Sequence, residues 1–209
     1  MPKKAASRAR KTAPSPSIDR LKNQLAAARK TIANLKLRAD TDGLLDILNR
    51  RGFERELRRS IAYIKRYRAG AAIVFLDVDG LKPINDRHGH AAGDAVLTAV
   101  ARTLTANVRL SDIVARLGGD EFGILLWNLD HADAIKKVRA LEQAVDGIEL
   151  THRGGTLHFG ASAGMTMLDG DDEPADVLRR ADQAMYERKR DRRKRTARAR
   201  PSAPAPVRR

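Results

Sequence analysis

The 209-residue chain contains no cysteine and only eight aromatic residues: four Phe, three Tyr and one Trp. The absence of cysteine excludes disulfides and thiolate-bound metal sites. No apolar run is long enough to cross a bilayer, and the N-terminal residues do not resemble a secretory signal, so we expect a cytoplasmic protein. The length suits one domain with extensions at its ends.

The positive charge, +15 in total, is concentrated at the two ends of the chain. Residues 1–39 and residues 188–209 each contain 11 Lys and Arg and one acidic residue, whereas the residues between them are net acidic. The segments 1–17 and 194–209 are rich in Ala, Pro, Ser and Arg, and we expect disordered basic arms there. Such arms could bind an acidic partner, nucleic acid or an anionic membrane, or could simply keep the protein in solution.

Residues 18–39 are predicted to form an amphipathic helix. Its apolar residues alternate in spacings of three and four, the pattern of a coiled-coil seam: Ile18, Leu21, Leu25, Ala28, Ile32 and Leu35. Fewer than three heptads make a weak dimer in isolation. We favour a parallel homodimer over the alternative, a single helix folded back on its own domain.

Two pairs of carboxylates follow predicted strands. The apolar run 71–76 is typical of a strand buried on both faces, and the alternation of a strand puts the next two carboxylates, Asp77 and Asp79, on one face. The sequence Gly-Gly-Asp-Glu at 118–121 lies between two apolar segments, which predicts a tight β-hairpin with carboxylates at its tip. Either pair alone could be a solvated turn, but carboxylates in this setting can hold a divalent metal.

A polar, glycine-rich segment lies between these pairs. Asn85 and Asp94 flank a compact turn, and their amide and carboxylate suit the edge of guanine, which presents a carbonyl acceptor beside N–H donors. His90 lies in the same segment, although a histidine there often only caps backbone groups. A helix should follow, because apolar residues recur at helical spacing: Leu97, Val100, Ala101, Leu104 and Val108.

The remaining elements complete an α/β (α+β) pattern. Strands and helices are expected in the order βαββαβ with an added hairpin, giving a central, mostly antiparallel sheet covered by helices.

With these pieces in place, residues 40–193 resemble a GGDEF domain, the family of diguanylate cyclases. Several motifs occur in the order of that family: 49–53 (NRRGF), 77–86 (DVDGLKPIND), 89–90 (GH), 93–94 (GD), 118–122 (GGDEF) and 181–186 (ADQAMY). The resemblance implies a palm-like fold similar to nucleotide cyclases and polymerases. It also implies that two GTP-loaded domains face each other and make cyclic di-GMP with Mg²⁺ or Mn²⁺, releasing pyrophosphate.

The resemblance assigns catalytic and metal-binding roles position by position. Asp77 would bind the metal through its side chain, Val78 through its backbone carbonyl, and Asp120 as the other ligand. Asp120 is the favoured base and Glu121 would assist, although neighbouring acids on one metal leave the choice of base open.

The substrate-binding positions follow from the same resemblance. Asn85 and Asp94 would recognise guanine, with His90 near the substrate. Lys189 and Arg193 match basic residues that contact phosphate, and Lys82 matches the lysine of the first Asp motif. Gly118 and Gly119 carry no Cβ and would let the backbone approach the nucleotide.

Arg109 and Asp112 match the family's Arg-x-x-Asp inhibitory site, at which cyclic di-GMP blocks turnover. An arginine fork suits phosphate or guanine. The alternative is a capped helix end with Asp112 at the start of a strand.

The chain departs from the family pattern at two glycines. Asp46 stands where the family has glycine, and an Asx residue tolerates a left-handed conformation at modest cost. Arg192 replaces the glycine that precedes the phosphate-contacting arginine, Arg193.

The leading interpretation is an active diguanylate cyclase. One alternative is a catalytically silent GGDEF module that binds GTP or cyclic di-GMP as a signal, although such modules usually lack the signature acids. Another is a nucleic-acid-binding protein that acts through its basic arms.

Overall fold

The computed structural model describes residues 16–199, and these are divided along the chain into two units, with the boundary between residues 39 and 40. The first unit is formed by helix α1 (Pro16–Asp40), in agreement with the predicted helix. The residues of its predicted seam are about half exposed or more: Ile18, Leu21, Leu25, Ile32 and Leu35. The N-terminal arm before Pro16 lies outside the described residues, and the pairing of α1 with a second copy stays a prediction.

The second unit is built on a five-stranded sheet with the order β1-β3-β4-β2-β7. All neighbouring strands are antiparallel except β1 and β3, which are parallel. The strands are β1 (Leu48–Asn49), β2 (Ala71–Asp79), β3 (Ile113–Gly118), β4 (Glu121–Trp127) and β7 (Gly160–Met167). A separate two-stranded hairpin joins β5 (Leu150–His152) to β6 (Gly155–Leu157). The predicted βαββαβ order with an added hairpin is confirmed.

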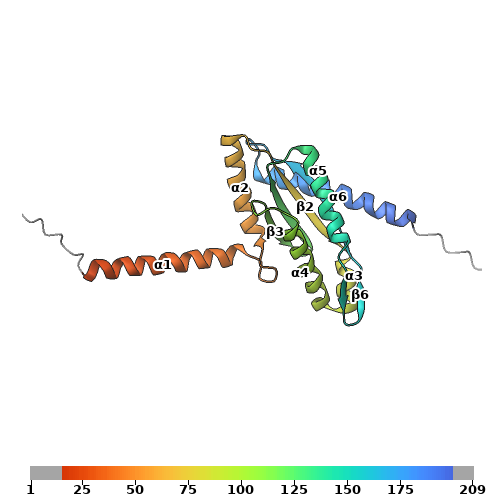
Figure 1. The fold of residues 1–209 in the computed structure, drawn as a ribbon, viewed down its shortest axis with the longest axis horizontal. Coiled ribbons are helices and arrows are strands. Elements are labelled where there is room, and N and C mark those ends of the chain that lie inside the picture. The colour runs from red at the N-terminus through yellow and green to blue at the C-terminus, as the bar shows by residue number, and fades with distance from the viewer. Residues whose placement is uncertain (1–15, 200–209) are drawn as a thin grey trace, which may run out of the picture. The chain divides into compact units, whose positions relative to one another are not determined.

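Helices cover both faces of this sheet (Figure 1). Two separate apolar clusters fill the space between helices and strands. On one face lie α2 (Arg50–Tyr67) and α6 (Pro174–Ala199); on the other lie α3 (Leu81–His88), α4 (His90–Ala106) and α5 (His131–Asp146).

The central strand β2 contributes to both clusters. Its side chains alternate, so that Val74 and Leu76 join the cluster under α4 whereas Ile73 and Phe75 join the cluster under α2. Burial on both faces explains why this strand has a continuous apolar run. The predicted core face of α4 is confirmed, since Leu97, Val100, Ala101 and Leu104 are buried and Val108 packs against them.

Asp46 adopts a left-handed conformation, with φ of +52°. This confirms the expectation for the residue that replaces glycine there. The carbonyl of Ile47 accepts a hydrogen bond from the amide of Asp42, and the turn that contains Asp46 remains intact.

Helix α6 continues to Ala199, beyond the domain end expected at residue 193. Extending an existing helix through Lys, Arg and Ala needs no new nucleation, and the composition that suggested a disordered tail therefore also favours helix next to α6. The remainder of the tail, from residue 200, lies outside the described residues.

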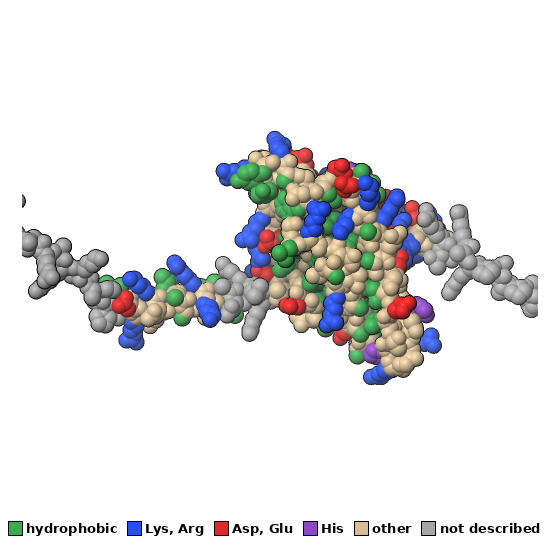
Figure 2. All heavy atoms as spheres, in the orientation of Figure 1, with side chains coloured by type: hydrophobic (Ala, Val, Ile, Leu, Met, Phe, Trp, Pro, Cys, Tyr) green, Lys and Arg blue, Asp and Glu red, His purple; other side chains and the backbone are tan. Residues whose placement is uncertain are grey.

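Figure 2 shows Lys and Arg side chains on α1, and both signs of charge interspersed over the domain. Within residues 16–199, no helix combines the length and the apolar character that a membrane span requires.

Candidate active site

The two predicted carboxylate pairs meet at one edge of the sheet. Strand β2 ends beside the start of β4, with Asp77 directly opposite Glu121 in the register. The backbone amide of Val78 donates a 3.0 Å hydrogen bond to the carbonyl of Asp120. Ladder pairing thus fixes the hairpin tip to the end of β2, and segments more than 40 residues apart in sequence become one acidic edge.

The tip of the β3–β4 hairpin is a two-residue turn formed by Gly119 and Asp120. Gly119 has φ of +45°, a conformation that side chains disfavour. Arg116 Nη2 donates to the carbonyl of Gly119 at 2.8 Å, and Arg116 Nη1 lies 3.4 Å from Asp42 Oδ2. The guanidinium therefore supports the turn from which the Asp120 side chain extends.

Burial and neighbouring negative charge act together at this edge. Burial raises the pKa of Asp77 above its usual value; a hydrogen bond from Lys189 opposes this shift, and Asp120 and Asp79 add to it. Lys189 Nζ lies 2.5 Å from Asp77 Oδ1. Asp77 and Asp79 lie on the same face of β2, as the alternation of a strand predicts. Both side chains therefore reach basic residues of α6.

The pKa of Glu121 is also raised, first by burial, and Arg50 lowers it while Asp182 and Asp120 raise it further. Arg50 Nη2 lies 3.6 Å from Glu121 Oε2, and Arg50 Nε donates to the carbonyl of Leu117 at 2.8 Å. Sequence reasoning missed this contact. The signal was present in the Asn-Arg-Arg motif, because Asn49 caps α2 and sets Arg50 in its first turn.

A groove of about 390 Å³ opens beside the acidic edge. Helices α3 and α4 form one wall and the hairpin tip forms the other. Its lining includes six positions singled out in the sequence: Lys82, Asn85, His90, Asp94, Gly119 and Asp120. These positions span almost 40 residues of chain, and only the packing of α3 and α4 beside the hairpin brings them together.

Asn85 stands out in this groove because its Oδ1 is buried and accepts no hydrogen bond. A buried amide oxygen without a donor is costly in free energy, because it has lost water and gained no other donor. Gly93 leaves the room for this side chain, since a Cβ at that position would lie 2.0 Å from Asn85 Oδ1. The glycine of the Gly-Asp pair at 93–94 is therefore required for close approach.

A family model described as "Diguanylate cyclase, GGDEF domain" matches residues 39–195. The chain belongs to this family. The probable diguanylate cyclase DgcE of Escherichia coli is 38% identical over 160 residues, 76% of this chain and 14% of that protein. Diguanylate cyclase TpbB of Pseudomonas aeruginosa is 37% identical over 175 residues, 83% of this chain and 40% of that protein. The chain therefore matches less than half the length of either relative.

Among solved structures, the GGDEF domain resembles the coiled coil and GGDEF domain of DgcB from Caulobacter crescentus in complex with c-di-GMP. The TM-score is 0.75 at 25% identity, covering 84% of this chain and 93% of that chain. The likeness agrees with the palm-like sheet expected from the sequence.

The basic residues of α6 differ in their placement within this GGDEF domain. Lys189 reaches the acidic edge, whereas Arg193 is exposed one turn further along. Residues four apart share a helix face, so Arg193 follows the stripe of Lys189 towards the end of the helix. Gly118 is exposed next to the turn and does not line the groove that Gly119 lines.

Arg109 and Asp112 lie at the opposite end of the β3–β4 hairpin from Asp120. Asp112 Oδ2 accepts the amide of Arg109 at 2.8 Å, and Asp112 Oδ1 accepts the amide of Trp127 at 3.0 Å. Both residues line a separate cavity of about 170 Å³ with Lys137. The structure thus brings the pair together but separates it from the groove.

The donors expected for a divalent ion are two carboxylates, Asp77 and Asp120, and the carbonyl of Val78. Within the described part of the chain no three His, Cys, Asp or Glu side chains form a metal cluster. The set nevertheless fits Mg²⁺, which prefers oxygen donors and binds through one or two carboxylates plus substrate phosphates. The negative charges of Asp120 and Asp79 raise the pKa of Asp77, and a cation bound at this edge would offset that repulsion.

Proposed function

We propose that this protein is an active diguanylate cyclase that condenses two GTP molecules into cyclic di-GMP and releases two pyrophosphates. The observation that carries the proposal is the groove in which Asn85 and Asp94 lie on one wall and Asp120 on the other. A base-recognition side chain and a metal-binding carboxylate on facing walls suit a bound nucleoside triphosphate.

Guanine recognition is assigned to α3 and α4. The Asn85 amide, rotated from Gly93 toward the groove, contacts the edge of the base, and the carboxylate of Asp94 accepts an N–H. His90 lies at the rim of the same groove. These contacts favour guanine over adenine, whose edge presents a different order of donors and acceptors.

Asp77, the carbonyl of Val78 and Asp120 would hold Mg²⁺ or Mn²⁺. Such an ion, when bound, screens phosphate charge, polarises the α-phosphate and lowers the pKa of the attacking hydroxyl. Lys189, which contacts Asp77 in the absence of the ion, would then be available to contact the phosphates. Arg193 and Lys82 add positive charge along the triphosphate.

The reaction is an in-line displacement at phosphorus. The 3′-oxygen of one GTP forms a bond to the α-phosphorus of the other, and the bond to the bridging oxygen of pyrophosphate breaks. Asp120 accepts the hydroxyl proton, with Glu121 beside it as the second carboxylate. Repeating the step with the nucleotides exchanged closes the ring.

A homodimer supplies the second GTP. The exposed apolar seam of α1 suits pairing with a second copy, and linked domains meet at high effective concentration. Leu25→Asp should therefore lower activity by about tenfold at dilute protein and abolish dimers in sedimentation. Asn23→Asp adds the same charge on the outer face of the helix, at an f position of the heptad, and should leave both unchanged.

Product inhibition at Arg109 and Asp112 is part of the proposal. The exposed Arg109 side chain suits phosphate or guanine, and Asp112 holds the backbone of the loop. Regulation through an acidic partner, nucleic acid or an anionic membrane at the basic arms stays a prediction, as does the cytoplasmic location.

The deciding experiment incubates the purified full-length protein with GTP and Mg²⁺ and separates the nucleotides by chromatography. Asp120→Ala serves as the inactive variant, and Glu149→Ala, an exposed carboxylate away from the groove, as the control. The proposal is supported if wild type and Glu149→Ala make cyclic di-GMP and Asp120→Ala does not. Bound GTP or cyclic di-GMP without turnover would support a silent binding module in its place.

A further inference from the structure

Helix α6 presents two basic stripes, and only one of them faces the acidic edge at Asp77. Arg188 and Arg192 form the second stripe, four residues apart, and both contact helix α5. Their partners, Glu142 and Asp146, are also four residues apart. The two helices are thus joined by a pair of ion bridges at matching helical spacing.

The first bridge is structural. Arg188 binds Glu142 through two nitrogens, with distances of 2.9 Å and 2.6 Å, and the Glu142 side chain is only 4% exposed. Glu142 Oε1 also accepts the amide of Ala163 in β7. This bridge lies away from the acidic edge and anchors α6.

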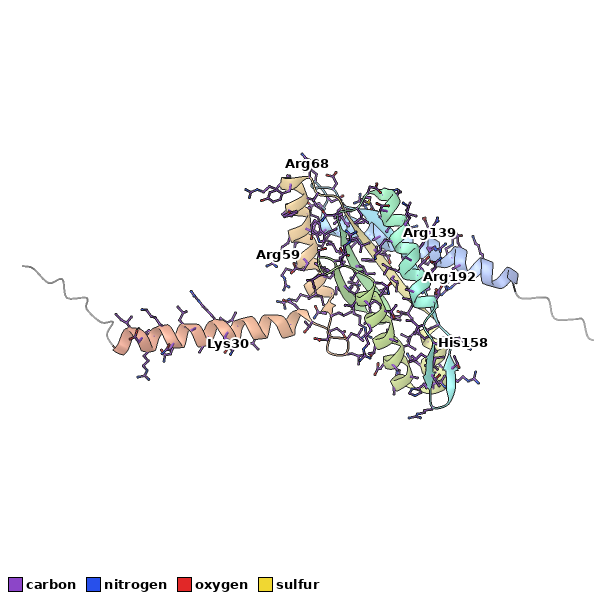
Figure 3. The ribbon with its side chains drawn as sticks, in the orientation of Figure 1. Lys30, Arg59, Arg68, Arg139, His158 and Arg192 are labelled. Atoms are coloured by element: carbon purple, nitrogen blue, oxygen red, sulfur yellow. The ribbon has the colours of Figure 1, made fainter. Side chains whose placement is uncertain are left out.

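The second bridge extends to Asp79, the last residue of β2. Arg192, labelled beside α5 in Figure 3, donates to Asp146 Oδ1 at 2.6 Å and to the carbonyl of Ala161 at 2.7 Å. Its Nε lies 3.6 Å from Asp79 Oδ2. Gly160 leaves the room, because a Cβ there would lie 2.6 Å from Arg192 Nη2.

Asp79 is held from two sides as a result. Its Oδ2 accepts the hydroxyl of Ser162 at 2.6 Å and faces the Arg192 guanidinium. Asp79 shares its strand face with Asp77, two residues away, and would otherwise be a further acidic ligand beside the metal position.

We propose that Arg192 is a positioning residue that withholds Asp79 from a divalent cation, leaving Asp77 and Asp120 as the carboxylates that bind it. The inference rests on the proposed function, because it assumes that Asp77 and Asp120 take a cation.

Removing the guanidinium frees Asp79 and increases the negative potential beside Asp77, so a cation should bind more tightly. A merely structural loosening of α6 would weaken cation binding instead, because the donors would lose their alignment. The sign of the change separates the two explanations.

The test is a titration of full-length protein with Mn²⁺ alone, with free ion followed by electron paramagnetic resonance. Arg192→Met should bind Mn²⁺ about three- to tenfold more tightly than wild type, the range expected for losing one nearby cation at a partly exposed site. Arg192→Lys keeps the charge and should stay within about twofold, as should Arg190→Met, which removes an exposed arginine of α6.

Asp79→Asn ties the effect to its partner. In the Arg192→Met background it should cancel the gain, and in wild type it should change the Mn²⁺ affinity by less than about twofold. If Arg192→Met fails to fold, the Mn²⁺ affinity of the single Asp79→Asn variant still tests the inference.

Unchanged or weaker Mn²⁺ binding by a folded Arg192→Met overturns the inference, as does a tenfold loss in Asp79→Asn alone. The titration contains no nucleotide, so a protein that makes no cyclic di-GMP still tests it. Wild type that binds no Mn²⁺ would reject both the inference and the proposed metal site.

Discussion

The β3–β4 hairpin has an aspartate near each end, and the two are used in different ways. At the open end, both oxygens of Asp112 accept backbone amides, from Arg109 and Trp127. At the tip, Asp120 is fixed through its backbone carbonyl, and its carboxylate faces the groove. The same residue type thus stabilises a loop at one end and is free for chemistry at the other, because the backbone around it decides which groups need partners.

The largest effect that separates the two ends should come from the tip. Asp120→Asn keeps the size of the side chain but removes a charged metal ligand, so turnover should fall by about a hundredfold or more. Thermal unfolding should change little, since the backbone hydrogen bond to Val78 is retained. Turnover is measured by chromatography of the GTP reaction, and thermal stability by a melting curve. Full turnover would reject the metal assignment.

Asp112→Ala should show the reverse pattern. Two amides lose their acceptor, and the free energy of unfolding should fall by about 1–3 kcal/mol in urea denaturation. Turnover at low product should persist at a temperature where the variant stays folded.

Arg109→Ala is the matched variant, because it removes an exposed side chain and leaves the loop amide in place. Its unfolding free energy should stay within about 0.5 kcal/mol of wild type. Inhibition by added cyclic di-GMP should be lost in both variants; persistence in Arg109→Ala would contradict the proposed inhibitory site.

A change of moderate size is expected on the far wall of the groove. Gly93→Ala places a Cβ against Asn85 Oδ1, so KM for GTP should rise about tenfold, the equivalent of one or two lost hydrogen bonds. In the Asn85→Ala background the same change should cost almost nothing. Additive effects in this double-mutant cycle would show that Gly93 acts elsewhere.

The smallest effect concerns pH. Folding raises the pKa of Asp77 above its ordinary 3.8, so the folded state holds its proton more tightly than the unfolded state. The contribution of this group to stability is present below about pH 4 and is lost as pH rises through the folded pKa. Relative to Asp77→Asn, wild type should therefore become less stable across that interval, measured by urea unfolding at several pH values. A wild type that gains stability relative to Asp77→Asn as pH rises would contradict the raised pKa.

Much of this arrangement was predictable from local pattern. The run 71–76 had to be a buried strand, and the glycines before Asp120 had to form a turn, because these depend on side-chain alternation and backbone freedom. The spacing in α4 likewise determined which of its residues are buried. The extent of α6 was less predictable, since Lys-, Arg- and Ala-rich sequence suits either a solvated arm or the continuation of a helix.

Contacts between residues distant in the chain could not be predicted from the sequence. Nothing local indicates that Asn85 lies against Gly93, or that Arg192 joins α5 to Asp79. The sequence by itself determined the strands, the turn and the acidic residues at their ends. Tertiary packing alone decided which carboxylates are held by arginines and which face the groove, because burial and charge at a site come from residues distant in the chain.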